Sequence, residues 1–172
     1  REPDYVCMTS YDETFPYPVL FEDKPLRATL GEVVSGAGVR QIRMAETEKY
    51  AHVTYFFNGS EEEPFPLEDR VLVPSSKVAT YDLKPEMSAN ELTDEAVRTL
   101  SDDTYGFFVL NYANADMVGH TGVIAAAVKA VETVDQCLGR LIEVVRRRSG
   151  TVIVTADHGN ADQMIDYETG GP

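Results

Sequence analysis

The chain is short of positive charge. Its 172 residues include 15 Lys and Arg against 29 Asp and Glu, which gives a formal net charge of -14. Binding to a phosphate backbone or to an anionic membrane surface needs clustered positive charge, so we expect neither a nucleic acid nor a membrane as a partner. An acidic surface fits a protein that binds cations, although its simplest role is to keep a protein in solution.

Cysteine and long apolar runs are also scarce. Cys7 and Cys137 are the only cysteines and lie far apart, without a metal-ligand spacing to a histidine. A disulfide between them is conceivable, but we expect reduced, half-buried thiols. No early apolar stretch resembles a signal peptide and no apolar run is long enough to span a membrane, which favours the cytoplasm. Because the chain starts at Arg1 and ends abruptly at Pro172, either natural terminus can be missing.

The sequence has no internal repeat or low-complexity tract, and we expect a single domain over residues 1–172. Residues 58–70 carry an acidic run and two prolines, which is typical of an exposed loop. A helix is expected to begin at Ser88, with Glu91 completing a capping box. Further predicted elements are strands at 5–8 and 40–45, helices at 26–37 and 47–58, and an extended segment at 71–87.

The last third of the chain has the clearest pattern. Residues 106–111 and 151–156 are apolar runs of strand length, and apolar residues recur at helical spacing from Ile124 to Val145 between them. A strand–helix–strand unit of this kind has parallel strands and a right-handed crossover. Continuous apolar strands are typical of a sheet that is covered on both faces. The predicted fold class is therefore α/β, with a mostly parallel sheet and helices on both faces.

Two of the three histidines stand close to an aspartate, in Asp116-Met-Val-Gly-His120 and in Asp157-His158. Carboxylate oxygens and imidazole nitrogens are ligands for divalent ions such as manganese and zinc. Each pair follows a predicted strand, and ligands of open parallel sheets bind beyond the carboxyl ends of the strands. Both pairs should thus lie on one edge of the sheet, where together they predict a metal centre. Gly119 and Gly159, beside the histidines, would allow close approach of the backbone to a metal or phosphate.

Each motif also has a simpler interpretation. A lone aspartate–histidine pair is more often a surface hydrogen bond or a turn than a metal site. Asp116 could merely start the helix that follows it, and Asp157 could cap a helix that begins near Asn160. His52 lies among apolar residues of a predicted helix, where a structural histidine with satisfied hydrogen bonds is the default.

Lys49 follows the strand predicted at 40–45. A lysine near a metal-bound phosphate can neutralise its oxygens as a compact point charge. From composition alone, however, Lys49 is more simply a solvated helix residue or a partner of Glu46 or Glu48. The acidic run at 61–63 is most simply a solvated loop.

Several segments together carry a resemblance to a known family. Segments 46–54, 77–82, 85–89, 111–122 and 156–160 together resemble cofactor-independent phosphoglycerate mutase, of the alkaline phosphatase superfamily, and the similarity runs in order through nearly all 172 residues. The family has a phosphatase domain interrupted by a transferase domain. The resemblance implies an alkaline phosphatase-like but incomplete fold, equivalent to the part of the phosphatase domain after that insertion.

The resemblance also implies roles for particular residues. Asp116 and His120 match two ligands of one manganese ion, and Asp157 and His158 match two ligands of the other, with magnesium as an alternative metal. Lys49 matches a lysine that contacts the substrate phosphate. The family's serine nucleophile, a further aspartate ligand and a third histidine ligand lie outside this chain, so we expect no catalytic nucleophile here and two incomplete metal sites.

The implied activity is the glycolytic interconversion of 3-phosphoglycerate and 2-phosphoglycerate through a phosphoserine, with the rest of the parent chain as a partner. Two alternatives remain open. One is a phosphopentomutase or another metal-dependent phosphatase of the same superfamily, which the aspartate–histidine pairs permit but the segments 46–54 and 77–82 disfavour. The other is a non-catalytic acidic module that binds cations. Under the mutase interpretation, the fragment alone should be inactive.

Overall fold

Three parallel strands form the centre of the protein. The computed structural model describes residues 5–12, 14–22, 24, 26–101 and 103–171. The strands lie in the order β2-β1-β3, and Gln41 at the start of the middle strand is opposite both Glu68 and Phe107. All residues of the middle strand are buried, as expected for a strand with neighbours on both sides. The strands are β1 (Gln41–Glu46), β2 (Glu68–Val73) and β3 (Phe107–Asn111).

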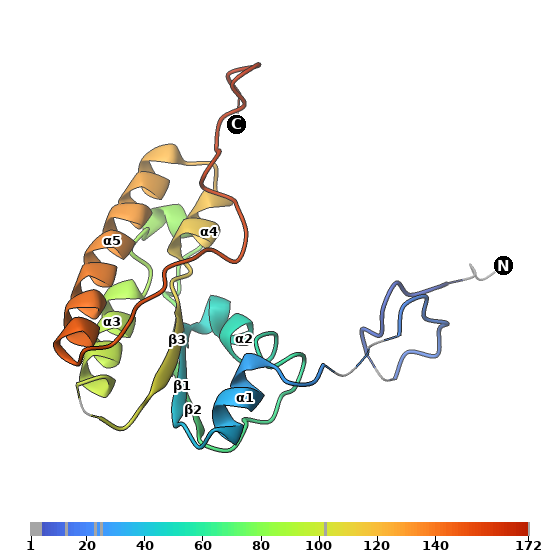
Figure 1. The fold of residues 1–172 in the computed structure, drawn as a ribbon. Helices are drawn as coiled ribbons and strands as arrows, with labels where there is room; N and C mark the ends of the chain where they lie inside the picture. Colours follow the sequence, from blue (N-terminus) through green and yellow to red (C-terminus); the bar gives the residue numbers. More distant parts are fainter. Residues whose placement is uncertain (1–4, 13, 23, 25, 102, 172) are drawn as a thin grey trace.

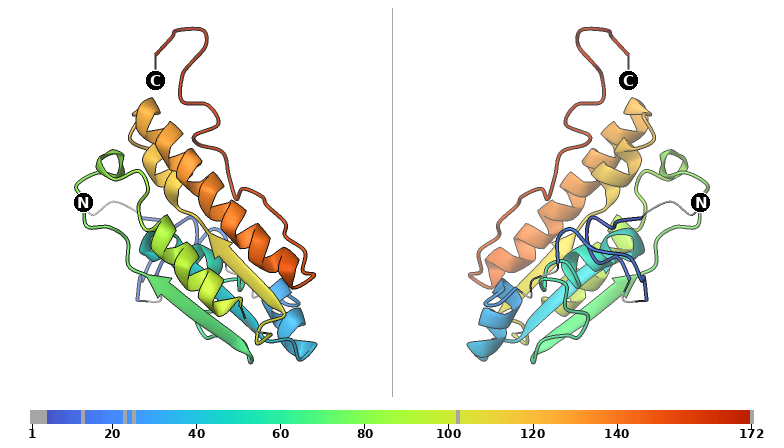
Figure 2. Two further views of the ribbon diagram at one scale, coloured as in Figure 1. Left: turned by 90° about the vertical axis from the view of Figure 1, so that its left-hand side faces the viewer. Right: turned by 90° about the vertical axis from the view of Figure 1, so that its right-hand side faces the viewer.

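Helices cover both faces of this sheet (Figure 1). The helices α3 and α5 pack together on one face, α1 and α2 lie on the other, and α4 follows the end of β3 (Figures 1 and 2). The predicted α/β class with a parallel sheet is therefore confirmed. The helices are α1 (Leu30–Gly36), α2 (Tyr50–Val53), α3 (Ala89–Thr99), α4 (Asn114–Gly119) and α5 (Ile124–Arg147), with short 3-10 helices η1 (Thr47–Lys49) and η2 (Tyr81–Leu83).

The main apolar core lies between β1 and the pair α3 and α5. Ile42 and Met44 alternate along β1 and point to this face, where Leu92 and Leu141 meet them. A second cluster of Met87, Ala113, Val118 and three alanines of α5 lies beneath α4. Because the alanines are small, α4 packs directly against α5. This packing fixes the position of the segment that follows β3.

The opposite face of β1 buries a cation. Arg43 has no exposed surface, and its guanidinium carbon lies 4.6 Å from the ring centre of Phe57 and 5.5 Å from that of Phe107. Its Nη2 donates to Gln41 Oε1 at 2.6 Å. A Cβ at Gly31 would lie 2.8 Å from that same Nη2, so the close approach of α1 to β1 requires glycine here. Burial lowers the pKa of Arg43.

The strand predicted at 151–156 is wrong. These residues follow α5 without a hydrogen-bonded strand partner among the described residues, and β3 pairs with β1 instead. Val152 packs on the main core, but Ile153 is 86% exposed and Val154 is 62% exposed. A β-branched composition fits a strand only where a neighbouring strand supplies the ladder.

Several predicted boundaries also differ from the structure. The helix predicted at 26–37 begins at Leu30, because Ala28 has a φ of 55° and Thr29 accepts a hydrogen bond from Glu32 N as the cap. The helix predicted at 47–58 is divided into η1, α2 and turns. The extended segment predicted from residue 71 begins as β2 at residue 68, inside the predicted acidic loop.

The predicted capping box at the start of α3 is also wrong. Ser88 precedes the helix, but its hydroxyl donates to the carbonyl oxygen of Pro74 at 2.8 Å and makes no cap hydrogen bond. Its backbone N–H donates to the buried Glu46 carboxylate at 3.4 Å. A tertiary contact has thus replaced the local one.

The N-terminal residues stand apart from the sheet in Figure 1. The strand predicted at 5–8 is reduced to a single bridge between Cys7 and Val19. Cys7 and Cys137 are both free, in agreement with the expected reduced thiols, but they are buried rather than half-buried. No helix in the described part of the chain is both long and apolar enough to cross a membrane.

Replacing Tyr112 by Phe should destabilise the fold by about 1 kcal/mol, because Tyr112 Oη shares a partly buried hydrogen bond of 2.6 Å with Thr93 Oγ1. Burial raises the pKa of Tyr112 from 10.0 to about 12, even though the bond to Thr93 opposes the shift. The folded state thus favours the neutral phenol of Tyr112. The contribution of this preference to the free energy of unfolding is lost as pH rises from 10 towards 12. Urea unfolding at neutral and alkaline pH measures both effects. Tyr167→Phe is the control, since Tyr167 is 84% exposed; equal stability of the two variants would contradict the prediction.

Candidate metal centre

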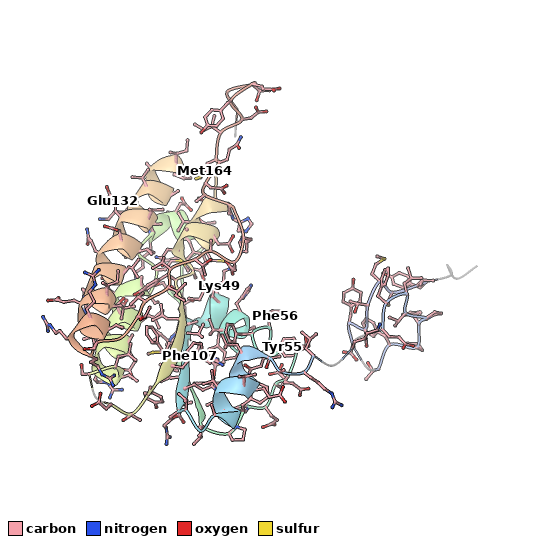
Figure 3. The ribbon with its side chains drawn as sticks, in the orientation of Figure 1. Lys49, Tyr55, Phe56, Phe107, Glu132 and Met164 are labelled. Carbon is pink, nitrogen blue, oxygen red and sulfur yellow. The ribbon has the colours of Figure 1, made fainter. Side chains whose placement is uncertain are left out.

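Lys49 and Asp116, two of the polar residues singled out in the sequence, lie at the carboxyl ends of β1 and β3. Lys49 ends η1, directly after β1, and Asp116 lies in the first turn of α4, directly after β3. Figure 3 shows Lys49 beside α2, at the end of the sheet that faces α4. Asp157 and His158 follow the extended segment 151–156 and reach the same edge.

Asp116 joins the other side chains. Its Oδ1 lies 3.1 Å from His120 Nε2, and its Oδ2 lies 2.7 Å from Lys49 Nζ and 3.8 Å from His158 Nε2. Lys49 Nζ also lies 3.4 Å from His158 Nε2. One carboxylate therefore connects residues that are more than 100 positions apart in the sequence, since Lys49 and His158 are separated by 109 positions.

The position of Asp116 follows from the packing of α4. Val118 is fully buried in the second apolar cluster, and Asn114 Nδ2 donates to the carbonyl oxygen of Pro85 at 2.8 Å. His120 is four residues after Asp116, so a helical turn places the two side chains on one face. Asp116 does lie in the first turn of a helix, as the simpler interpretation expected. That interpretation does not account for its contacts with Lys49, His120 and His158.

Lys49 is neither solvated nor paired with its acidic neighbours. It is 4% exposed, and its ammonium pairs with Asp116. Glu46 is buried and accepts hydrogen bonds from a serine hydroxyl and a backbone N–H, while Glu48 accepts from Tyr81 Oη at 2.7 Å. The simple interpretation of Lys49 is therefore wrong, and a buried ammonium of this kind requires the compensating charge that Asp116 provides.

The Asp116 carboxyl has a lowered pKa. Partial burial alone would raise it, but hydrogen bonds from Lys49 and Asn160 and the nearby positive charge outweigh burial. Asp116 is therefore ionised at neutral pH, which is the form that binds a metal.

The second pair is less tightly held. Asp157 Oδ1 lies 3.8 Å from His158 Nε2, and the Asp157 side chain is 45% exposed. No helix begins near Asn160 in the described residues, so the alternative role of Asp157 as a helix cap is wrong. His52 lies in α2 with its ring 5.5 Å from that of Phe56, which agrees with a structural role. Its buried Nδ1 has no hydrogen-bond partner among the described residues, so the expectation that its hydrogen bonds are satisfied is wrong.

The donor set suits a divalent metal. Bonds of about 2.0–2.2 Å in tetrahedral geometry separate neighbouring donors by roughly 3.5 Å. The distances of 3.1 Å from Asp116 Oδ1 to His120 Nε2 and of 3.8 Å from Asp157 Oδ1 to His158 Nε2 bracket that value. The ammonium of Lys49 lies among the same atoms, so they already surround a positive charge. Within the described residues, no three His, Cys, Asp or Glu side chains form a complete metal-binding group. Each pair thus provides only part of a coordination shell.

Asn160 is a site residue that the sequence prediction missed. Its Nδ2 donates to Asp116 Oδ1 at 2.7 Å and to the Asp116 carbonyl oxygen at 3.1 Å. The only indication in the sequence was that Asn160 lies two residues after His158 in the same motif. That position was interpreted only as the start of a helix. An open depression beside this contact is lined by Gly119, His120, Gly122, Asn160 and residues 163–166.

Comparison with protein families supports a metal-dependent protein. A family model described as the metalloenzyme superfamily matches residues 19–170. The chain belongs to this superfamily. Membership indicates dependence on a divalent metal, which agrees with the carboxylate and imidazole donors at the sheet edge.

The individual relatives are phosphoglycerate mutases. The chain is 59% identical over 168 residues to 2,3-bisphosphoglycerate-independent phosphoglycerate mutase 2 of Methanosarcina barkeri, covering 98% of this chain and 32% of the relative. It is also 59% identical over 173 residues to the corresponding mutase of Symbiobacterium thermophilum, covering 100% of this chain and 34% of the relative. The chain spans about a third of the length of these relatives, and the resemblance seen in the sequence is confirmed.

A solved structure supports the same relationship. Leishmania mexicana phosphoglycerate mutase, crystallised at low cobalt concentration, superposes with a TM-score of 0.85 at 36% sequence identity. The superposition covers 98% of this chain and 31% of the Leishmania chain. The fold is therefore that of part of a phosphoglycerate mutase, which has an alkaline phosphatase-like architecture.

Proposed function

We propose that this chain is the C-terminal portion of the phosphatase domain of a cofactor-independent phosphoglycerate mutase. The whole protein would interconvert 3-phosphoglycerate and 2-phosphoglycerate in the cytoplasm. The observation that carries the proposal is the convergence of Lys49, His120 and His158 on Asp116. The relatives add support, because the chain aligns with mutases over nearly its full length.

In this proposal the two pairs hold two metal ions, one at Asp116 and His120 and the other at Asp157 and His158. Manganese suits a mixed set of carboxylates and imidazoles, and magnesium is the alternative. Bound metals would neutralise charge on the transferring phosphoryl group and activate a serine hydroxyl.

The chain's own residues have separate tasks in the reaction. The ionised Asp116 carboxylate provides a fixed negative charge at the edge of the sheet. Lys49 provides a compact positive charge that a phosphate oxygen of the substrate can approach. The serine nucleophile, the remaining metal ligands and the transferase domain would come from the rest of the parent protein.

Comparison of the 172-residue chain with the complete protein tests the proposal. With Mn²⁺ present, the complete protein should convert 3-phosphoglycerate to 2-phosphoglycerate, and the 172-residue chain should show no turnover because it lacks the nucleophile. Ribose phosphates assayed in parallel would identify a phosphopentomutase. Mutase turnover by the short chain, or a preference of the complete protein for pentose phosphates, would contradict the proposal.

A further inference from the structure

Asn160 links the two segments that carry the proposed metal ligands. It lies two residues after His158, and its side chain crosses to α4, where Nδ2 donates to both Oδ1 and the carbonyl oxygen of Asp116. One amide thus holds the side chain and the backbone of the same residue. The contact spans 44 positions of sequence.

Space for this amide depends on Gly119. A Cβ on Gly119 would lie 2.6 Å from Asn160 Oδ1 and 3.0 Å from its Cγ, which is closer than real Cβ contacts. Gly119 has an ordinary helical conformation at the end of α4, so its backbone does not require glycine. The absence of a side chain at position 119 therefore serves the Asn160 contact.

The hydrogen bonds of Asn160 constrain which oxygen of Asp116 faces each neighbour. Lys49 Nζ bonds Oδ2, whereas Asn160 Nδ2 bonds Oδ1, the oxygen that faces His120. Rotation of the carboxylate would break both contacts. A carboxylate ligand held in this way loses little side-chain freedom when it binds a metal, and such outer contacts commonly change metal affinity by about 10- to 100-fold.

We propose that Asn160 is a positioning residue that orients Asp116 for metal binding, and that Gly119 is glycine in order to admit the Asn160 side chain. This inference rests on the metal site proposed above. It gives Asn160 a role that the metal-ligand pattern does not suggest, and it gives Gly119 a role other than the close approach of backbone to a metal or phosphate.

Titration of the complete protein with Co²⁺, followed by its visible absorption, tests the inference. Asn160→Ala should weaken Co²⁺ binding by about 10- to 100-fold and alter the absorption spectrum. Gly119→Ala should have a similar effect, because the added methyl displaces the end of a flexible side chain while leaving the helix intact. Gly139→Ala is the matched control, since Gly139 lies in α5 and a methyl group added there would meet no heavy atom within 4 Å. The affinity of this control should equal that of the wild type.

The double variant Asn160→Ala/Gly119→Ala separates positioning from general damage. If Gly119 acts through Asn160, the double variant should bind Co²⁺ no more weakly than Asn160→Ala alone. Additive losses, or wild-type affinity and spectrum in both single variants, would overturn the inference while leaving the metal site intact. A wild-type protein that binds no Co²⁺ would instead overturn the proposed metal site and this inference together.

Discussion

Replacing Asp116 by Asn in the complete protein is expected to lower the rate of phosphoryl transfer by about 10³-fold or more. The substitution keeps the shape of the side chain but removes the charge that meets Lys49, His120 and His158. A catalytic metal contributes several kcal/mol of charge stabilisation to a transition state, and each 1.36 kcal/mol corresponds to about tenfold in rate. Loss of one metal therefore accounts for the expected magnitude.

The measurement is the initial rate at saturating Mn²⁺, together with the number of Mn²⁺ ions bound per chain. Asp135→Asn provides a control, because Asp135 is an exposed residue of α5. This substitution removes the same charge from a residue outside the proposed metal site. Far-UV circular dichroism establishes that both variants are folded. Activity of Asp116→Asn within tenfold of the wild type would show that Asp116 is not a metal ligand.

Replacing Lys49 by Met should separate substrate binding from metal binding. The variant is expected to lose about 10- to 100-fold in kcat/KM for 3-phosphoglycerate, since a hydrogen bond between charged groups contributes about 1.5–3 kcal/mol. Its affinity for Mn²⁺ should stay the same or increase, because the ammonium 2.7 Å from Asp116 Oδ2 competes with a cation for that oxygen.

Steady-state kinetics and Mn²⁺ titration on the same preparations measure the two effects. Lys129→Met is the control, because Lys129 is an exposed lysine of α5 and its loss should change neither quantity. The two roles would be wrongly assigned if Lys49→Met weakened Mn²⁺ binding as much as substrate binding, because Lys49 would then only support the structure of the site.

The sequence predicted best those elements that are long and locally determined. The 24 residues of α5 repeat their apolar positions over many turns, and β3 is a short, mostly apolar run. The segment 151–156 has the composition of a strand but does not form one, since strand formation depends on a partner elsewhere in the chain. Ser88 shows the same limitation at a helix start, because a tertiary contact with Pro74 replaced the predicted cap.

The candidate site shows a similar division. The rule that ligands bind beyond the carboxyl ends of parallel strands applies to Asp116, which follows β3. The same rule assigned Asp157 to that edge through a strand at 151–156 that the structure does not contain. The pairing of Lys49 with Asp116 was not predictable, because it joins residues 67 positions apart by way of β1–β3 pairing. The role of Asn160 was hidden for the same reason, since its importance depends on the space left by Gly119.

Anomalous X-ray diffraction from crystals of the complete protein grown with Mn²⁺ tests the two-metal centre most directly. The account predicts two anomalous peaks, one within coordination distance of Asp116 and His120 and the other within coordination distance of Asp157 and His158. Peaks at other residues, or no peak beside either pair while the protein is active, would contradict it.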